Sequence, residues 1–159
     1  METIYLLLGS NQGDSLKVLN ETIQKLGELG DVISQSSVYK TGAWGKTNQP
    51  DFYNQVIDFR SKLEPVALLN ELKAIENSLG RIITEKWGPR LIDIDILFYG
   101  NITINSSELT IPHSRLHERK FTLIPLNELN PEFIHPVFKK SVKILLAECQ
   151  DNLTVVKLD

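Results

Sequence analysis

Cysteine, long apolar runs and an excess of one charge are all scarce in this chain of 159 residues. Its single cysteine, Cys149, excludes a disulfide within the chain, so we expect a reducing compartment, the cytoplasm. The apolar run at residues 3–8 is too short to span a membrane, and no basic segment precedes it as in a secretion signal. The formal net charge of -3 provides no basic field for nucleic acid. The sequence therefore argues against a membrane protein, a secreted protein and a nucleic-acid-binding protein.

The motifs with which many enzymes bind ATP are also missing. The chain contains no Gly-x-x-x-x-Gly-Lys-Ser/Thr loop, and no glycine loop or His-Arg-Asp loop of the protein-kinase type. Residues 9–13 include two glycines but no lysine, so they have little weight as a phosphate site. Any ATP site in this chain is therefore not a P-loop.

The composition is that of an ordinary globular domain. Hydrophobic residues make up 42% and charged residues 23%, and a chain of this length can bury one core. Segments of helical and of strand character alternate without a repeat or a low-complexity linker. This pattern predicts a single α+β domain over residues 1–159, and we expect it to be a monomer.

Apolar runs and alternation predict the strands, and a period of 3.6 residues predicts the helices. Strands are expected at residues 3–8, 31–40, 53–61, 92–99 and 154–157, and helices at residues 15–26, 65–79, 115–129 and 141–149. Gly100 and Asn101 predict a hairpin in which residues 102–105 return along strand 92–99.

The first two helices have interpretable ends and apolar stripes. Asp14 or Ser15 is expected to cap the first, and Pro65 suits the first turn of the second. The predicted buried positions are Leu16, Leu19, Ile23 and Leu26 in the first helix, and Leu68, Leu69, Leu72, Ile75 and Leu79 in the second.

Two acidic residues, Asp93 and Asp95, alternate with apolar residues along strand 92–99. Side chains alternate between the faces of a strand, so we expect the aspartates on one face, with nothing packed against it. The apolar residues expected on the other face are Ile92, Ile94, Ile96 and Phe98. The backbones of Asp93 and Asp95 would lie roughly 6–7 Å apart, which allows both carboxylates to bind magnesium. Magnesium prefers oxygen ligands and usually shares them with substrate phosphates. The alternative is a water-facing strand, although two like charges on one face repel each other unless a cation neutralises them.

The loop before this strand is basic. Residues 80–91 contain Arg81, Lys86 and Arg90 against one acid, Glu85. Cations beside a metal-binding acid pair suit a polyphosphate, which would contact metal on one side and guanidinium groups on the other. A solvated charged loop is the alternative.

These residues resemble the signature of a known family. The segment Trp87-Gly-Pro-Arg90-Leu-Ile-Asp93-Ile-Asp95 is similar to that of the 6-hydroxymethyl-7,8-dihydropterin pyrophosphokinases of folate biosynthesis. Further segments occur in the family's order along nearly the whole chain. They are Gly9-Ser10-Asn11, Ser37-Val-Tyr-Lys-Thr41, Gln49-Pro-Asp-Phe-Tyr-Asn54, Glu76, Gly80-Arg81 and Ile111-Pro-His113. The chain departs from the family pattern at Lys73, Ile83 and Ser114.

The resemblance implies a ferredoxin-like α+β fold, mainly an antiparallel sheet with helices packed on it. It also implies transfer of the terminal pyrophosphoryl group of ATP to the hydroxymethyl oxygen of the pterin, with release of AMP. Asp93 and Asp95 would hold two Mg²⁺ ions, and Arg81 and Arg90 would be the further catalytic residues.

The resemblance also implies two sets of binding residues. The ATP-binding positions would be Glu76, Arg81, Trp87, Arg90, Ile96, Thr110, His113 and Arg119. The pterin-binding positions would be Thr41, Gly42, Ala43, Trp44, Phe52, Asn54, Asp93 and Phe121. Phe52 and Phe121 would stack on the two faces of the flat ring, and the amide of Asn54 would pair with its edge.

Two other hypotheses stay open at this level. The chain could be a metal-dependent nucleotidyl or phosphoryl transferase with a different acceptor. It could also be a non-enzymatic ferredoxin-like module that binds a ligand or RNA, although its acidic charge and the aspartates on a sheet face oppose RNA binding.

Overall fold

The computed structural model describes residues 1–42, 50–80 and 91–158. The strands are β1 (Ile4–Ser10), β2 (Asp31–Gln35), β3 (Tyr39–Thr41), β4 (Phe52–Arg60), β5 (Asp93–Tyr99), β6 (Ile104–Asn105), β7 (Thr110–Ile111) and β8 (Val155–Lys157). The helices are α1 (Ser15–Leu26), α2 (Pro65–Ser78), α3 (Lys120–Leu129) and α4 (Val142–Glu148), with a 3-10 turn, η1, at Leu116–Glu118.

The main sheet is antiparallel throughout. Its strand order is β5-β1-β4-β3-β8, and β2 also pairs with β4. The long strand β4 therefore pairs with β1 along one edge and with both β2 and β3 along the other. The chain order β1-α1-β2-β4-α2-β5, with β5 and β1 adjacent, is that of a ferredoxin-like fold, which confirms the expected α+β class.

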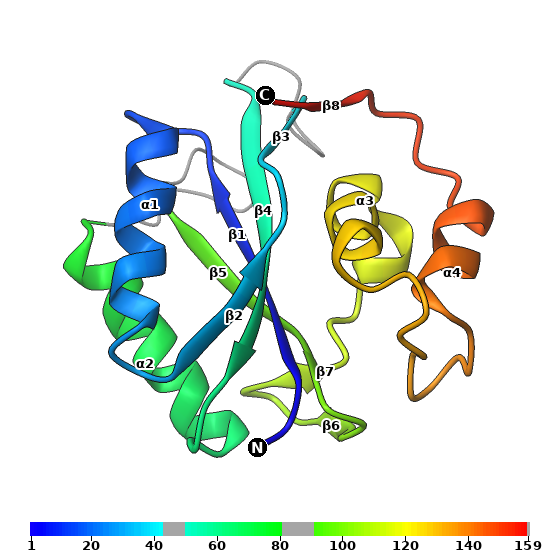
Figure 1. Cartoon of the computed structure of the whole chain (residues 1–159), viewed down its shortest axis with the longest axis horizontal. Coiled ribbons are helices and arrows are strands. Elements are labelled where there is room, and N and C mark those ends of the chain that lie inside the picture. The colour runs from blue at the N-terminus through cyan, green and yellow to red at the C-terminus, as the bar shows by residue number, and fades with distance from the viewer. Residues whose placement is uncertain (43–49, 81–90, 159) are drawn as a thin grey trace.

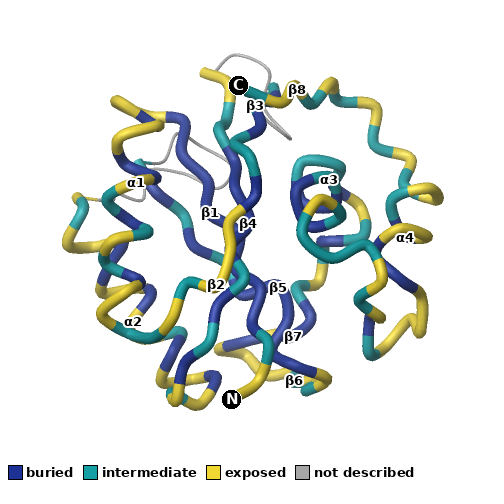
Figure 2. Tube along the Cα trace, in the orientation of Figure 1, coloured by how far each residue is buried: buried dark blue, intermediate teal, exposed yellow. Residues whose placement is uncertain are grey.

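The helices form one layer on each face of the sheet. Figure 1 shows α1 and α2 on one face and α3 and α4 on the other. Alternate residues of β1 supply the two cores: Leu6 packs with the α1–α2 layer, whereas Tyr5 and Leu7 pack with the α3–α4 layer. Buried residues accordingly follow the strands between the two layers (Figure 2). In the described ranges, no helix combines the length and the apolar character needed to cross a bilayer.

The ends of the first two helices agree with the sequence prediction, but the buried face of α1 is rotated relative to the predicted apolar stripe. The carboxylate of Asp14 accepts the amide of Lys17 at 3.3 Å, so Asp14 is the N-cap of α1. Val18 takes the buried place predicted for Leu16, which is 47% exposed. Leu16 was misassigned because the face that contacts the sheet is centred on Val18 and Thr22 rather than on every leucine of the segment.

A bulge in β5 changes the predicted division of its side chains. Tyr5 lies opposite Phe98 and Leu6 lies opposite Ile96, so Leu97 is an extra residue in β5. The alternation is reset there, and Phe98 packs in the α3–α4 core rather than beside the isoleucines. The prediction for Phe98 was therefore wrong, as was that of an unpacked aspartate face. Beyond the bulge, α3 and α4 cover that face.

The predicted hairpin after Gly100 is also wrong. The chain does turn there, with Gly100 at a positive φ of 54°. However, β6 pairs with β7 in a separate two-stranded sheet instead of returning along β5. Local turn chemistry located the turn but could not identify the partner of the next strand.

Two segments predicted as single elements are divided in the structure. Residues 31–40 form β2 and β3, because Ser36 bonds to Val56 through both its amide and its hydroxyl where the two strands separate. Residues 115–129 form η1 and then α3, with Arg119 in an extended conformation between them. This break places the Arg119 side chain at the start of α3, where the site lies.

Candidate active site

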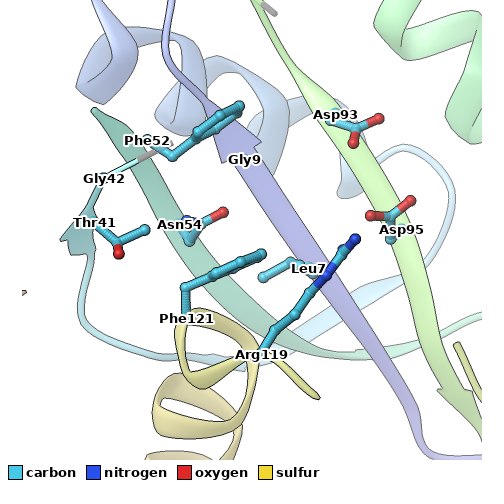
Figure 3. A pocket seen from close by; sticks show the side chains of 10 residues that line it. All are labelled: Leu7, Gly9, Thr41, Gly42, Phe52, Asn54, Asp93, Asp95, Arg119 and Phe121. Atoms are coloured by element: carbon cyan, nitrogen blue, oxygen red, sulfur yellow. The ribbon is translucent and has the colours of Figure 1, made fainter. Parts of the chain in front are cut away.

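A pocket lies between the sheet and the start of α3. It encloses about 600 Å³, including the part open to solvent. Figure 3 shows the side chains that face this space, which come from β1, β3, β4, β5 and the start of α3. The lining residues are Leu7, Gly9, Thr41, Gly42, Phe52, Asn54, Asp93, Asp95, Arg119 and Phe121. The fold thus brings together residues from distant parts of the sequence, with eight of the predicted site residues among these ten.

The acid pair occupies the β5 side of the pocket. Asp93 lies opposite Gly9 and Asp95 opposite Leu7 on β1, so both carboxylates project on the pocket face before the bulge. Between them along the strand, the amide of Ile94 donates to the buried carboxylate of Glu76 at 2.7 Å. Glu76 therefore holds the backbone that carries the two aspartates. Its predicted contact with ATP stays a prediction.

His113 lies beside the acid pair. Its Nε2 is 3.8 Å from Oδ2 of Asp95, which is too long for a hydrogen bond. Its Nδ1 accepts the amide of Arg115 at 3.1 Å. Burial, helped by the positive charge of Arg119, lowers the pKa of His113 to about 4, against the opposing effect of Asp93. The ring is therefore neutral at pH 7 with its proton on Nε2, the nitrogen nearest Asp95.

Arg119 brings a buried positive charge to the same pocket. The residue is 6% exposed, and its guanidinium carbon lies 5.5 Å from the centre of the Phe121 ring, within the range of a cation–π contact. Burial lowers the pKa of Arg119, and the carboxylate of Asp95 opposes that shift. The pocket thus combines two half-buried carboxylates with a buried guanidinium group.

The other side of the pocket is an aromatic slot. Phe52 and Phe121 lie on opposite sides of it, with Asn54 between them (Figure 3). Asn54 is 3% exposed, and in the described part of the chain its Nδ2 has no hydrogen-bond partner. Buried amides are nearly always paired, so this donor is set up for a ligand. A flat heteroaromatic ring with an acceptor on its edge would fill the slot and satisfy it.

Some predicted site residues lie elsewhere. The side chain of Ile96 is buried in the α1–α2 core, so it could reach a nucleotide only through its backbone. Thr110 is exposed on β7 and lines a neighbouring cleft together with His113. Five predicted residues lie outside the described ranges: Ala43, Trp44, Arg81, Trp87 and Arg90.

Two lining residues, Leu7 and Gly9 of β1, were not predicted as site residues from the sequence. Gly9 was named only as part of residues 9–13 and of a family segment, whereas it belongs to β1 and faces Asn54 across the β1–β4 pair. The signal that could have identified it is a glycine inside an apolar strand, which often marks a close approach by another group.

The acid pair limits which metal would suit the site. In the described residues, no group of three or more His, Cys, Asp or Glu side chains could hold a metal ion. Transition metals in proteins favour such clusters, whereas Mg²⁺ is commonly bound by one or two carboxylates, with water and substrate phosphates as its other ligands. The two carboxylates of Asp93 and Asp95 are donors of the kind that a hard cation takes.

The fold and the pocket define a ferredoxin-like α+β protein in which one pocket joins an aromatic slot to a carboxylate pair. The model of the 7,8-dihydro-6-hydroxymethylpterin-pyrophosphokinase (HPPK) family matches residues 5–131, and the chain belongs to this family.

Relatives with this name cover most of the chain. The 2-amino-4-hydroxy-6-hydroxymethyldihydropteridine pyrophosphokinase of Aquifex aeolicus is 43% identical over 143 residues, which are 90% of this chain and 89% of that protein. The protein of the same name from Haemophilus influenzae is 38% identical and covers 86% of each chain. Among solved structures, Plasmodium falciparum HPPK-DHPS with pteroate has a TM-score of 0.74 at 20% identity. That likeness covers 92% of this chain and 42% of the longer Plasmodium chain, and it supports the fold.

Proposed function

We propose that this chain catalyses the reaction for which its family is named, in folate biosynthesis: transfer of the pyrophosphoryl group of ATP to 6-hydroxymethyl-7,8-dihydropterin. The observation that carries this proposal is the joining of an aromatic slot and an acid pair in one pocket. The slot suits a flat acceptor, and the acid pair suits a metal-bound polyphosphate donor.

The pterin is proposed to lie between Phe52 and Phe121. In that position its edge would accept the buried amide hydrogens of Asn54, which otherwise lack a partner in the described chain. Thr41 and Gly42 line the same side of the pocket, and the acid pair lies across from them. A hydroxymethyl group on the ring would then point towards Asp93 and Asp95. Ala43 and Trp44 remain proposed pterin contacts outside the described residues.

Asp93 and Asp95 are proposed to hold two Mg²⁺ ions. When bound, these ions would neutralise phosphate oxygens and polarise the phosphorus under attack. The carboxylates contribute the negative charge that draws them to this wall of the pocket, and Glu76 fixes the strand between them.

Positively charged side chains and hydrogen-bond donors of the protein would bind the triphosphate of ATP. The neutral His113 can donate through Nε2 to a phosphate oxygen, and the guanidinium of Arg119 can donate two parallel hydrogen bonds. Arg81 and Arg90 are proposed as the further catalytic residues. The remaining proposed ATP contacts are Glu76, Trp87, Ile96 and Thr110.

The chemical step is an in-line displacement. The hydroxymethyl oxygen of the pterin bonds to the β-phosphorus of ATP and loses its proton, while the bond from that phosphorus to the oxygen bridging the α- and β-phosphates breaks. AMP leaves with the bridging oxygen. Charge builds on the β-phosphate oxygens during this step, and the buried Arg119 lies where it could stabilise that charge.

A product assay tests the proposal. The protein is incubated with ATP, MgCl₂ and 6-hydroxymethyl-7,8-dihydropterin, and the nucleotides are separated by ion-exchange chromatography. We expect AMP and pterin diphosphate in equal amounts. ADP as the nucleotide product would refute pyrophosphoryl transfer, and nucleotide turnover that does not depend on the pterin would favour a transferase with another acceptor.

The variant Asp95→Asn tests the site in the same assay. It keeps the shape of the side chain but removes the charge, so we expect turnover to fall by at least about 100-fold. The side chain is 31% exposed, so urea unfolding should change little. Glu148→Gln, at the exposed C-terminal end of α4, is the control and should retain wild-type turnover. A rate near wild type for Asp95→Asn would remove this aspartate from the proposed metal site.

We also propose that residues 1–159 act as one catalytic domain, as a monomer in the cytoplasm. The main sheet includes strands from both the first and the last ten residues of the chain, which supports one folding unit. Light scattering with both substrates present should give a mass close to 18.0 kDa.

A further inference from the structure

The chain after α4 returns to the sheet and contacts both flanks of the aromatic slot. Figure 1 shows it running from α4 past α3 to β8, which lies beside β3. We call residues 151–158 the strap. The family model ends at residue 131, so the strap lies outside the matched region.

At its start, the strap holds the first turn of α3. Oδ2 of Asp151 accepts the amide of Lys120, the first residue of α3, at 3.0 Å. The neighbouring N-cap residue, Arg119, makes no capping hydrogen bond with its own side chain. Asp151 thus caps this helix from 31 residues away, and a carboxylate at a helix N-terminus is also favoured by the helix dipole. Lys120 lies directly between Arg119 and Phe121, both of which line the pocket.

Asp151 is itself held in position. Its other carboxylate oxygen, Oδ1, accepts the amide of Leu153 at 3.0 Å. The side chain therefore uses one oxygen to fix its own turn and the other to fix α3. An arrangement with both oxygens engaged limits the freedom of the helix start.

At its end, the strap pairs with β3. In the register of this pair, Thr41 lies opposite Val155 and Tyr39 opposite Lys157. The hydroxyl of Thr41 also donates to the carbonyl of Thr154 at 3.0 Å. On its other edge β3 pairs with β4, where Thr41 lies opposite Phe52. Without β8, the short strand β3 would therefore be an outer strand of the sheet directly beside the slot.

We propose that the strap is a positioning segment that sets the separation of the two sides of the slot, Phe121 on α3 and the Thr41–Phe52 pair on the sheet. It touches neither substrate. It preorganises the slot, so that binding of the pterin costs less free energy for ordering the two sides. The identity of the bound pterin rests on the proposed function. The positioning of α3 and β3 by the strap does not depend on it.

Two variants test the two ends of the strap independently. Deletion of residues 154–159 removes β8 and leaves Asp151 and Leu153 in place. Because β3 lies across the sheet from the acid pair of β5, we expect the KM for the pterin to rise about tenfold while the KM for MgATP stays within about twofold. A merely destabilised protein would instead lose active fraction, which lowers kcat and leaves both KM values unchanged.

The second change is Asp151→Ala, which releases the start of α3. Arg119 and Phe121 flank the released amide, so the KM values for MgATP and for the pterin should both rise, each about fivefold. Asp151→Asn keeps an oxygen acceptor and should restore most of the loss. Glu148→Gln removes an exposed ion pair between Lys140 and Glu148, the last residue of α4, and should change neither KM.

Hydrogen exchange tests the structural part independently of catalysis. We expect faster exchange at the amides of residues 39–41 in the deletion variant, and of residues 122–123 in Asp151→Ala. Unchanged exchange in both would overturn the proposal, even if the wild type made no AMP and the proposed function had failed. Faster exchange with an unchanged pterin KM would also overturn it, because the strap would then hold the walls without affecting binding.

Discussion

Gly9 and Asn54 face each other on neighbouring strands at the base of the slot. A Cβ atom added at Gly9 would lie 2.8 Å from Oδ1 of Asn54, closer than real Cβ contacts come. Gly9 has no positive φ, so its backbone would accept any residue. Position 9 therefore needs glycine for lack of space. Any larger residue would push the amide of Asn54 out of its orientation towards the slot.

The variant Gly9→Ala should weaken pterin binding through this contact. The amide of Asn54 must rotate away from the new methyl group, so its buried Nδ2 no longer points at the ring edge. A lost hydrogen bond to a ligand in a buried site is commonly worth a factor of about ten, and we expect the pterin dissociation constant to rise by that factor. Isothermal titration calorimetry with the pterin measures it. Affinity for MgATP should stay unchanged.

Gly27→Ala is the matched control for this substitution. Its added Cβ would lie 3.2 Å from the carbonyl of Gln24 at the end of α1, away from the pocket. If the two alanine variants bound the pterin equally well, the close contact at Gly9 would have no bearing on recognition.

At the level of the elements, α3 is also joined to the β3 region near its C-terminal end. The carboxylate of Glu128 accepts the hydroxyl of Tyr39 at 2.6 Å and the amide of Ser37 at 3.0 Å. Burial and the bond to Glu128 raise the pKa of Tyr39 to about 12. For Glu128 itself, burial favours the neutral form, but the hydrogen bonds from Tyr39 and Ser37 outweigh it and lower the pKa. The charged carboxylate is therefore the form that joins the helix to the sheet.

The variant Glu128→Ala should lower the free energy of unfolding by about 2 kcal/mol, because the partly buried Tyr39 hydroxyl and the Ser37 amide both lose their acceptor. Tyr39→Phe removes only one of these donors and should cost about 1 kcal/mol. Urea unfolding at pH 7 measures both. Equal losses in the two variants would mean that the bond to Ser37 contributes nothing.

Elements with a strong local pattern could be predicted from the sequence, and their pairing could not. Pro65 and Asp14 marked the helix starts because caps depend on nearby residues. The bulge at Leu97 and the pairing of β6 with β7 depend on strands that are distant in the sequence. The hydrogen bonds of Glu128 could not be predicted for the same reason. Glu128 lies 91 positions from Ser37 and 89 positions from Tyr39 in the sequence.

Eight of the residues named from the sequence line one pocket, because a motif carries its chemistry in a few side chains. Asp93 and Asp95 were indicated by alternation together with the basic loop and the family pattern, and Phe52, Asn54 and Phe121 followed from the family pattern. Gly9 and Asp151 were not predicted. Their roles arise from a steric contact and from a cap supplied by a remote segment, which no local spacing reveals.

For the whole molecule, the buried histidines make stability depend on pH. His135 lies in the α3–α4 connection, 3% exposed, with its ring stacked on Phe138 at 4.2 Å between centroids. Its Nδ1 accepts the amides of Val137 and Phe138, each at 3.1 Å. Burial, together with the charge of His117, lowers the pKa of His135 to about 4.

The sign of the resulting pH dependence follows from the two states. The unfolded chain protonates His135 near its ordinary pKa of about 6.5, whereas the folded chain resists protonation until about pH 4. The contribution to stability is therefore complete above about pH 6.5 and is lost as the pH falls towards 4. His113 acts in the same direction, since its pKa is also lowered to about 4. The wild type should thus lose stability over this window through two histidines.

The variant His135→Asn isolates one of them. An asparagine Oδ1 can accept the two backbone amides that Nδ1 accepts now, so the fold of the connection should persist while the titration disappears. Between pH 7 and 4.5 the variant should therefore lose about 2 kcal/mol less stability than the wild type, measured by urea unfolding at each pH. His113, His117 and all carboxylates are common to both proteins and cancel in the difference. Parallel stability curves for the two proteins would mean that His135 is protonated as easily in the folded chain as in the unfolded one, which its burial against Phe138 argues against.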